Sequence, residues 1–238
     1  MVFLPHCHST NEVTKAMAKS GSLSNGSIVI TNFQENGRGQ QGNVWLSEKD
    51  KNLLFTILLK PTNFVPNRQY LLNVMTSIAI QQTLEKYLTK SKIEIKWPND
   101  IYVNEAKIAG ILIETTISRN QLESVFCGIG LNVNQGHFSL NSATSMLIES
   151  GETFDLDQVL ETLLTEMEKV YEVMNNDPKN LLNQYQENLR WFEEERTFMV
   201  DSQETQGTIK GIDEQGKLIV DLSGEIRHFA LKEIAFLH

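Results

Sequence analysis

The sequence predicts an α+β domain followed by a small β domain, and two observations support this. Up to about residue 192, apolar runs of strand length alternate with longer segments in which apolar residues recur at helical spacing. From about residue 195, short β-type runs are separated by turns. We therefore place the domains at residues 1–192 and 193–238. The second domain is too small to be very stable alone, so we expect it to pack on the first.

The elements of the first domain follow from local patterns. Ser9 and Glu12 have the spacing of a capping box, which predicts that a helix begins there. Runs rich in apolar and β-branched residues predict strands at 27–33, 52–60, 93–97, 101–103, 108–114 and 121–132. Helical spacing of apolar residues predicts an amphipathic helix over 68–88 and further helices over 154–173 and 178–192.

The second domain is predicted to be a small antiparallel sheet with a barrel-like form. Its strands are expected at 196–200, 207–212, 218–222 and 226–230, with turns at 213–216 and 223–224.

Charge is distributed unevenly along the 238 residues, whose net charge is −9. Residues 152–204 hold 4 basic and 14 acidic groups, whereas residues 1–151 hold 13 basic and 11 acidic groups. The acidic balance argues against a general nucleic-acid binder, because phosphate contacts need clustered Lys and Arg. The first two thirds can nevertheless host an anion, and we interpret the acidic stretch as the solvated face of helices.

Composition also bears on location and on metals. The apolar runs are too short to span a membrane, and the first 20 residues do not have the pattern of a secretory signal. Cys7 and Cys127 cannot build a disulfide framework, so a reducing cytoplasm fits best. No histidine has the spacing of a metal site, and we expect none.

The glycine-rich segment 37–42 can approach an anion closely. Glycine lets backbone N–H groups come near a ligand, and Arg38 adds a fork of donors for phosphate or carboxylate. The segment lacks the pattern of a P-loop or of a dinucleotide fold. A flexible surface loop is the alternative interpretation.

The segment 96–100, Lys-Trp-Pro-Asn-Asp, lies between two predicted strands. A hairpin turn explains Pro-Asn-Asp but not the neighbouring Lys96 and Trp97. Trp97 can offer a flat face to a ring, while Lys96 and Asp100 can serve a phosphate and its metal.

Two later strands carry glycines that suggest a pocket wall. Lys107 stands at the mouth of a predicted strand, and Gly110 inside it suggests close approach of a ligand. A bulge with a surface lysine is the alternative. Gly128 and Gly130 interrupt another apolar strand, and Asn132 after them can bind a polar ligand.

Taken in order, these segments resemble the biotin protein ligases over nearly the whole chain. The resemblance rests on Ser9-Thr10-Asn11, Gln34 with Gly37-Arg38-Gly39 and Trp45, residues 96–100, residues 107–112, Gly128-Ile-Gly130-Leu-Asn132 and Ala143-Thr144-Ser145-Met146. It implies a mixed sheet with helices packed on it, of the class II synthetase-like type, and an SH3-like C-terminal barrel. Because Ser9 lies almost at the start, we expect no N-terminal helix-turn-helix domain and no DNA binding.

The activity implied by the resemblance has two steps. Biotin attacks the α-phosphate of MgATP to give biotinyl-5′-AMP, and a lysine of a biotin carboxyl carrier protein then takes the biotinyl group. ATP and Mg²⁺ are thus implied, along with a carrier domain of a biotin-dependent carboxylase. A monomer or weak homodimer is expected.

The resemblance also implies roles for individual residues. The catalytic residues would be Arg38, Lys107 and Asp100. The biotin site would comprise Ser9, Thr10, Asn11, Gln34, Gly37, Arg38, Gly39, Gln40, Lys107, Gly110 and Gly128. The ATP site would comprise Arg38, Gln40, Trp45, Lys96, Asn99, Asp100 and Asn132, with Trp45 stacked on adenine. Residues 34–45 would close over the intermediate.

Two departures from the family pattern lie in the glycine loop. Gln40 stands where a second arginine is common, and Asn43 where a further basic residue is frequent. Since glutamine cannot neutralise a phosphate, we predict weaker retention of the adenylate, or compensation by Lys96. The alternatives to this function are a lipoate or octanoate ligase or transferase, a non-catalytic biotin sensor, and a protein-interaction module.

Overall fold

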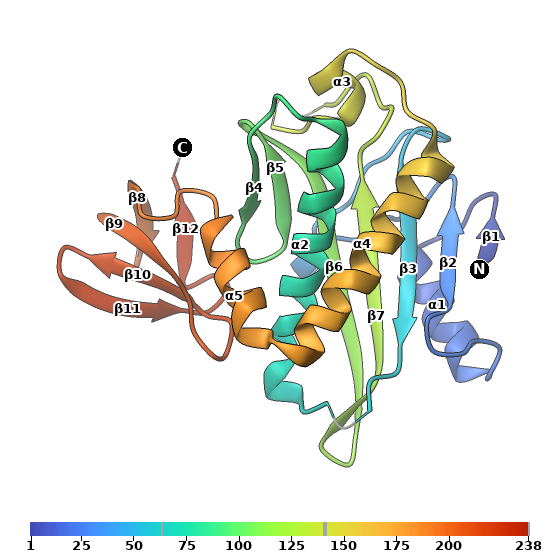
Figure 1. Cartoon of the computed structure of the whole chain (residues 1–238), viewed down its shortest axis with the longest axis horizontal. Helices are drawn as coiled ribbons and strands as arrows, with labels where there is room; N and C mark the ends of the chain where they lie inside the picture. Colours follow the sequence, from blue (N-terminus) through green and yellow to red (C-terminus); the bar gives the residue numbers. More distant parts are fainter. Residues whose placement is uncertain (63, 140–141, 238) are drawn as a thin grey trace.

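A computed structural model describes residues 1–62, 64–139 and 142–237, with no description of the Gln41 side chain. Its main sheet has seven strands in the order β1-β2-β3-β7-β6-β5-β4 (Figure 1). The strands are β1 (Val2–Leu4), β2 (Ile28–Thr31), β3 (Leu53–Leu59), β4 (Ile93–Lys96), β5 (Asp100–Val103), β6 (Ala106–Ser118) and β7 (Gln121–Leu131). β1 runs parallel to β2, and every other neighbouring pair is antiparallel. The sheet is therefore mixed, as expected.

Helices cover both faces of this sheet. α2 (Tyr70–Tyr87), α4 (Leu156–Asn176) and α5 (Pro178–Glu187) lie on one face, and α1 (Thr10–Lys19) on the other (Figure 1). A short α3 (Met146–Ser150) precedes α4. Among the described residues, no helix is both long and apolar enough to cross a membrane. The sequence patterns missed β1 and α3, which are three and five residues long and carry little periodicity.

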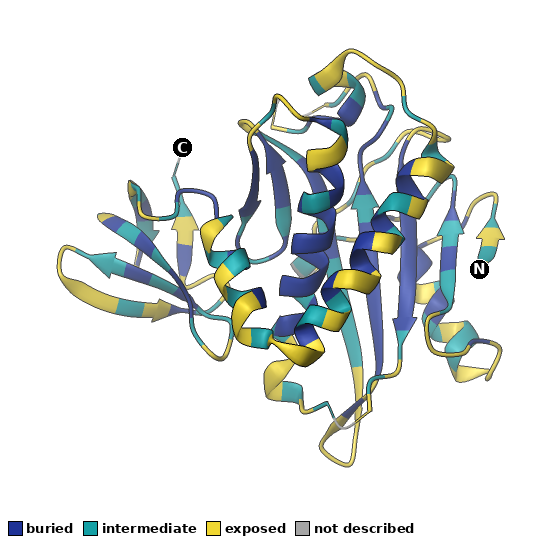
Figure 2. Ribbon diagram, viewed as in Figure 1, coloured by how far each residue is buried: buried dark blue, intermediate teal, exposed yellow. Residues whose placement is uncertain are grey.

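α2 is buried on more than one side, so the amphipathic pattern described only part of it. Thr76, Ser77, Gln81 and Thr83 are buried along with its apolar residues. The hydroxyls of Thr76 and Thr83 donate to the carbonyls four residues earlier, which satisfies them inside the core. Figure 2 shows the centre of α2 as buried, with α4 beside it on the same face of the sheet.

The start of α1 corrects the capping-box prediction. Ser9 is the N-cap residue, as the spacing indicated, but its side chain makes no capping hydrogen bond. Glu12 forms an ion pair with Arg38 at 2.7 Å. Ser9 is buried at the edge of a cavity, so its hydroxyl stays available for a ligand.

The acidic stretch lies largely on the helices that cover the sheet face away from α1. Most of its carboxylates are exposed, as interpreted from the sequence. Glu166 is the buried exception, and Lys86 and Lys169 pair with it at 2.6 and 2.8 Å.

The C-terminal part forms a five-stranded antiparallel sheet in the order β11-β10-β9-β8-β12, at the far left of Figure 1. Its strands are β8 (Glu195–Val200), β9 (Gln203–Ile212), β10 (Leu218–Leu222), β11 (Glu225–Phe229) and β12 (Ile234–Phe236). Four of these strands were predicted, although the prediction started β9 at residue 207 and the strand begins at Gln203. The fifth strand, β12, was missed. The domain division at residues 192 and 193 remains a prediction.

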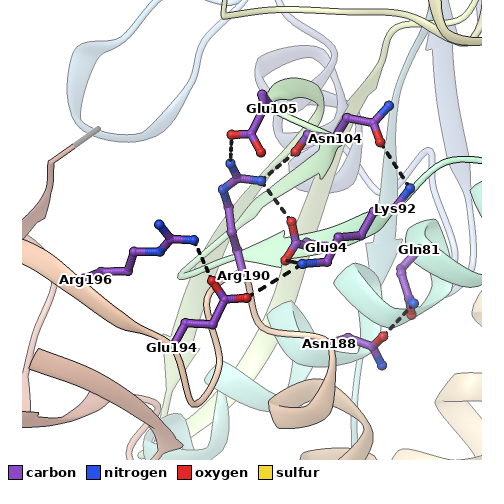
Figure 3. A network of polar contacts seen from close by, with 9 residues as sticks. All are labelled: Gln81, Lys92, Glu94, Asn104, Glu105, Asn188, Arg190, Glu194 and Arg196. Carbon is purple, nitrogen blue, oxygen red and sulfur yellow. Dashed lines mark hydrogen bonds and ion pairs between the residues drawn. The ribbon is translucent and has the colours of Figure 1, made fainter.

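A buried arginine fixes the segment that joins α5 to β8. Arg190 is 1% exposed, and its guanidinium donates to Glu94 at 2.9 Å, Glu105 at 2.5 Å and the carbonyl of Asn104 at 2.6 Å (Figure 3). It also lies 4.9 Å from the ring centre of Tyr102. Because β4, β5 and the turn between β5 and β6 supply these partners, the C-terminal sheet is anchored to the edge of the main sheet.

Trp97 forms a second anchor between the two sheets. It is 7% exposed, and its Nε1 donates to the carbonyl of Gly216 in the β9–β10 turn at 3.0 Å. The ring is thus packed between the sheets instead of standing free for a ligand ring. This use of Trp97 was not foreseen from the sequence.

Candidate active site

A cavity of about 250 Å³ lies on the α1 face of the main sheet. It is lined by most of the residues that the sequence singled out: Ser9, Thr10, Asn11, Gln34, Arg38, Gly39, Gln40, Trp45, Asn99, Asp100, Lys107, Gly110 and Gly128. Gly37, Lys96 and Asn132 do not line it. Segments from α1, the glycine loop and four strands or turns therefore converge on one place.

The floor of the cavity is made by glycines in the two central strands. Gly110 on β6 pairs with Gly130 on β7, and Gly128 lies two residues earlier on the same face. A Cβ on Gly130 would lie 2.5 Å from Cε2 of Trp45, and one on Gly110 would lie 2.9 Å from Cζ3. Trp45 therefore lies flat on backbone, which only glycine permits here. At Gly128 a Cβ would collide with the amide of Asn11.

A buried hydrogen-bond network orients the residues at the start of α1. The Thr56 hydroxyl lies 2.6 Å from Oδ1 of Asn11 and 2.8 Å from the hydroxyl of Thr10. Oε1 of Gln34 accepts from the backbone N–H of Thr10 at 2.8 Å and from its hydroxyl at 3.1 Å. Thr56 is fully buried in β3 and was missed, although a polar residue within the apolar run 53–59 was a usable signal.

An ion pair stands behind this network. Nδ2 of Asn11 donates to Glu114 at 2.8 Å, and Lys15 pairs with the same carboxylate at 2.6 Å. Burial alone would raise the pKa of Glu114. The hydrogen bonds from Lys15 and Asn11, with the charges of Lys15 and Arg38, outweigh burial and bring this pKa below its ordinary value. Glu114 thus stays ionised and holds the Asn11 amide in one orientation.

Two cations line the cavity among the described residues, and both have a carboxylate partner. Lys107 pairs with Asp100 at 2.7 Å, and its ammonium lies 5.5 Å from the ring centre of Trp45. Arg38 pairs with Glu12 at 2.7 Å at the rim. An anionic ligand can recruit these cations only by sharing or displacing those carboxylates.

The glycine loop is folded back as a hairpin over the cavity. The backbone N–H of Trp45 donates to Gly37 at 2.8 Å, and that of Gly39 donates to Asn43 at 2.7 Å. A Cβ on Gly37 would clash with the carbonyl of Trp45. Gly37 therefore serves the hairpin itself, which explains why it does not line the cavity.

A smaller hollow of about 190 Å³ lies on the other side of Trp45 and Lys107. Tyr102, Asn132 and Ala143 line it together with those two residues. Nδ2 of Asn132 donates to the carbonyl of Thr144 at 3.0 Å, while its buried Oδ1 has no partner among the described residues. A buried acceptor in that state calls for a donor from a ligand or water.

Lys96 lies away from both hollows. Its ammonium is 3.4 Å from the Tyr102 hydroxyl and 5.3 Å from the ring centre of Phe236 in β12. Burial lowers the pKa of Lys96, while Asp100 raises it and Arg190 and Lys107 lower it further. Lys96 joins the two sheets, and this structure gives no support to its compensating for Gln40 in the cavity.

Comparison with known families decides the relationship. The family model described as "Biotin/lipoate A/B protein ligase family" matches residues 3–132, more than half of the chain. The chain belongs to the biotin/lipoate A/B protein ligase family. A second model, "Biotin protein ligase C terminal domain", matches residues 197–236, which hold nearly all of the five-stranded sheet.

Relatives of this family member align along nearly its whole length. It is 27% identical to the bifunctional ligase/repressor BirA of Escherichia coli, over 98% of this chain and 72% of that protein. It is 26% identical to the biotin–[acetyl-CoA-carboxylase] ligase of Mycobacterium tuberculosis, over 91% of this chain and 81% of that protein.

A solved structure shares the fold of this family member. The biotin protein ligase of Aquifex aeolicus, in complex with biotin and ATP, superposes with a TM-score of 0.81 at 24% identity and covers 98% of this chain. The predicted α+β fold with a second, all-β sheet is thus confirmed.

Proposed function

We propose that this chain is a biotin protein ligase, which activates biotin with ATP and transfers it to a lysine of a carrier protein. The observation that carries the proposal is the single cavity in which Ser9, Thr10, Asn11, Gln34, Arg38 and Lys107 meet. The match of residues 197–236 to a biotin protein ligase domain supports biotin over lipoate as the acyl group.

In the first step a carboxylate oxygen of biotin forms a bond to the α-phosphorus of ATP, and pyrophosphate leaves. Two anions must approach each other, so cations have to offset their repulsion. Lys107 lies between the two hollows and can reach both the carboxylate and the phosphate. Arg38 adds a second cation from the hairpin, once the ligand competes with Glu12.

The two hollows suit the two substrates. The polar network of Thr10, Asn11 and Gln34 suits the ureido ring of biotin, which needs both donors and acceptors. The hollow beside Trp45, with the unpartnered Oδ1 of Asn132, suits the adenosine part of the nucleotide. Trp45 would exchange its contact with the glycine floor for one with the base.

Mg²⁺ is implied by the use of ATP, and the donors near Lys107 fit it. Asp100 is the one carboxylate among the described residues that line the cavity, and Asn99 lies beside it. Mg²⁺ commonly takes one or two carboxylates together with substrate phosphates and waters. When bound, it would supply positive charge to the phosphates.

In the second step the lysine ε-amine of the carrier forms a bond to the acyl carbon, the bond from that carbon to the phosphate oxygen breaks, and AMP leaves. The amine must give up a proton. Asp100 can accept that proton, since its carboxylate lines the cavity and Lys107 holds it at 2.7 Å.

The carrier would be a biotin carboxyl carrier protein of a biotin-dependent carboxylase. We also propose that the protein works in the cytoplasm. Both cysteines are free thiols, which fits a reducing compartment. We propose a monomer or weak homodimer.

The test uses the chain with biotin, MgATP and a biotin carrier domain, and follows the intact mass of the carrier. We expect one biotinyl adduct with the parent chain and none with Lys107→Ala. A parallel reaction with lipoate tests the alternative acyl group. A carrier that gains lipoate but not biotin contradicts the assignment.

A further inference from the structure

A third hollow opens beside the candidate active site, where the start of α2 faces the β9–β10 turn. Its volume is about 500 Å³, which is within the range of ligand-binding clefts. Residues 66–74 form one wall and residues 212–217 the other, and we call it the junction groove. Gln40, Pro98 and Leu231 line both this groove and the active-site cavity. The groove is therefore continuous with the cavity.

The walls of the junction groove combine aromatic rings with side-chain amides. The rings are Tyr70, Trp97 and Tyr185, and the amides are Gln40, Asn67, Gln69, Asn73 and Gln215. Among the described residues that line it, Lys217 is the only charged one. Side-chain amides can both donate and accept hydrogen bonds, which suits the N–H and C=O groups of a peptide backbone. A nucleotide triphosphate would need more than one cation, so the groove fits a peptide better.

One of these amides has an unused acceptor. Nδ2 of Asn73 donates to the carbonyl of Pro98, but its buried Oδ1 has no partner among the described residues. A buried acceptor is stabilised by a donor from outside, such as a peptide N–H or a lysine ammonium. Pro98 lines both the groove and the active-site cavity, so Asn73 is bonded to a residue at which the two hollows meet.

The order of the reaction requires a separate entrance of this kind. AMP is still attached to biotin when the lysine attacks, so the lysine cannot enter through the hollow that holds the nucleotide. Within the described parts of the chain, the hollow beside Trp45 and the junction groove have no lining residue in common. Each instead borders the central cavity on its own side.

We propose that the junction groove binds the carrier segment that bears the target lysine and leads that lysine into the cavity. The inference rests on the proposed function. It assigns the carrier to a surface built jointly by α2 and the C-terminal sheet. Trp97, through its bond to Gly216, holds the two walls of that surface at a fixed separation.

Tryptophan substitutions at the groove mouth test the proposal. Asn67 and Gln215 are exposed on opposite walls, and Asn67→Trp or Gln215→Trp fills the groove. Their neighbours Arg68 and Glu214 are exposed but do not line it, so Arg68→Trp and Glu214→Trp are matched controls. For the groove variants we expect kcat/KM for the carrier to fall at least roughly tenfold, mainly through KM.

Two assays that need no carrier separate this proposal from the proposed function. Biotin-dependent exchange of pyrophosphate into ATP reports the first step, and hydroxylamine captures the adenylate as a small nucleophile. Both rates should stay within about twofold of the parent in all four variants. Unchanged carrier kinetics in the groove variants, an equal loss in the controls, or a matching loss of exchange each contradicts the groove. Absence of exchange in the parent contradicts the proposed function instead.

Blocking the groove chemically after the protein has folded separates the loss of carrier binding from any effect of a substitution on folding. Cys7 and Cys127 are both buried, so a cysteine introduced by Gln215→Cys is the readily accessible thiol. A bulky maleimide added to the folded protein should lower carrier kcat/KM while sparing exchange. The same label on Glu214→Cys should leave both unchanged, and equal effects at the two positions contradict the proposal.

Discussion

The two faces of the central strands have opposite properties, although successive residues of each strand point alternately to one face and to the other. On the side of α2 and α4, β3 and β7 present Phe55, Ile57 and Leu131 to a continuous apolar core. On the side of α1, Gly128 and Gly130 of β7 line a cavity, and Thr56 of β3 bonds Asn11, which lines it too. The first face thus supplies stability by filling space. The α1 face supplies binding where Gly128 and Gly130 leave space open, while Leu58 and Phe126 of the same strands pack under α1 in a smaller apolar cluster. Substitutions of neighbouring residues should separate these two contributions.

Gly130→Val should have the largest effect on activity. Valine favours a strand, so the fold is retained, but its side chain takes the place of Trp45 on the floor of the cavity. Displacing Trp45 and the hairpin should lower kcat/KM for adenylate formation roughly 100-fold or more. Pyrophosphate exchange measures the rate, and the thermal midpoint checks the fold. Near-parent activity would show that the glycine floor is not needed.

Leu131→Ala, one residue later, should have the converse effect. Leu131 is fully buried in the core on the opposite face. Removing its side chain should lower the free energy of unfolding by about 2–5 kcal/mol. KM for biotin should change less than about twofold, because the cavity wall is not altered. Urea unfolding and exchange kinetics on the same preparation measure both, and a large rise in KM without loss of stability argues against the division between faces.

Thr56→Val removes one hydroxyl from the cavity face and keeps the shape of the side chain. It leaves Oδ1 of Asn11 without its 2.6 Å donor, which costs about 1–3 kcal/mol for a buried group. We expect KM for biotin to rise roughly tenfold, with KM for ATP unchanged. Thr56→Ser keeps the hydroxyl and should restore the parent KM. Failure of serine to restore it would show that packing, and not the hydrogen bond, is what matters.

Thr56 also shows where sequence reasoning succeeds and where it stops. Apolar periodicity and β-branched runs predicted most strands and helices, because burial of one face determines these patterns. Motif residues such as Lys107 were predicted because their chemistry and spacing are unusual together. Thr56, Arg190 and the Trp97–Gly216 bond act through partners between 40 and 120 residues away, and no local pattern contains such partners.

Glu114→Gln should expose a pH dependence that belongs to the cavity face alone. Because the pKa of Glu114 in the folded chain lies below its ordinary value of 4.5, ionisation stabilises the fold fully above that value. This contribution is lost as pH falls through the lower, folded-state pKa. We expect the variant to be about 1 kcal/mol less stable at pH 7. The difference should shrink below about pH 4.5 in urea titrations. A difference that persists unchanged at low pH contradicts this assignment, and Lys15→Met is the matched control for the ion pair.

Gln40→Arg should have the smallest effect, and it tests how charge is balanced at the cavity. Lys107 and Arg38 are already paired with Asp100 and Glu12, so neither cation among the described lining residues stands without a carboxylate partner. An arginine at position 40 would add one unpaired cation beside the adenylate. At partly exposed sites such a charge is worth about 0.2–1 kcal/mol, so release of biotinyl-5′-AMP should slow by no more than about fivefold. Gel filtration of labelled adenylate, followed by its rate of escape, measures the effect. Higher salt should diminish it, because exposed charges are screened. An escape rate that is the same in both proteins at low salt contradicts the idea that Gln40 weakens retention.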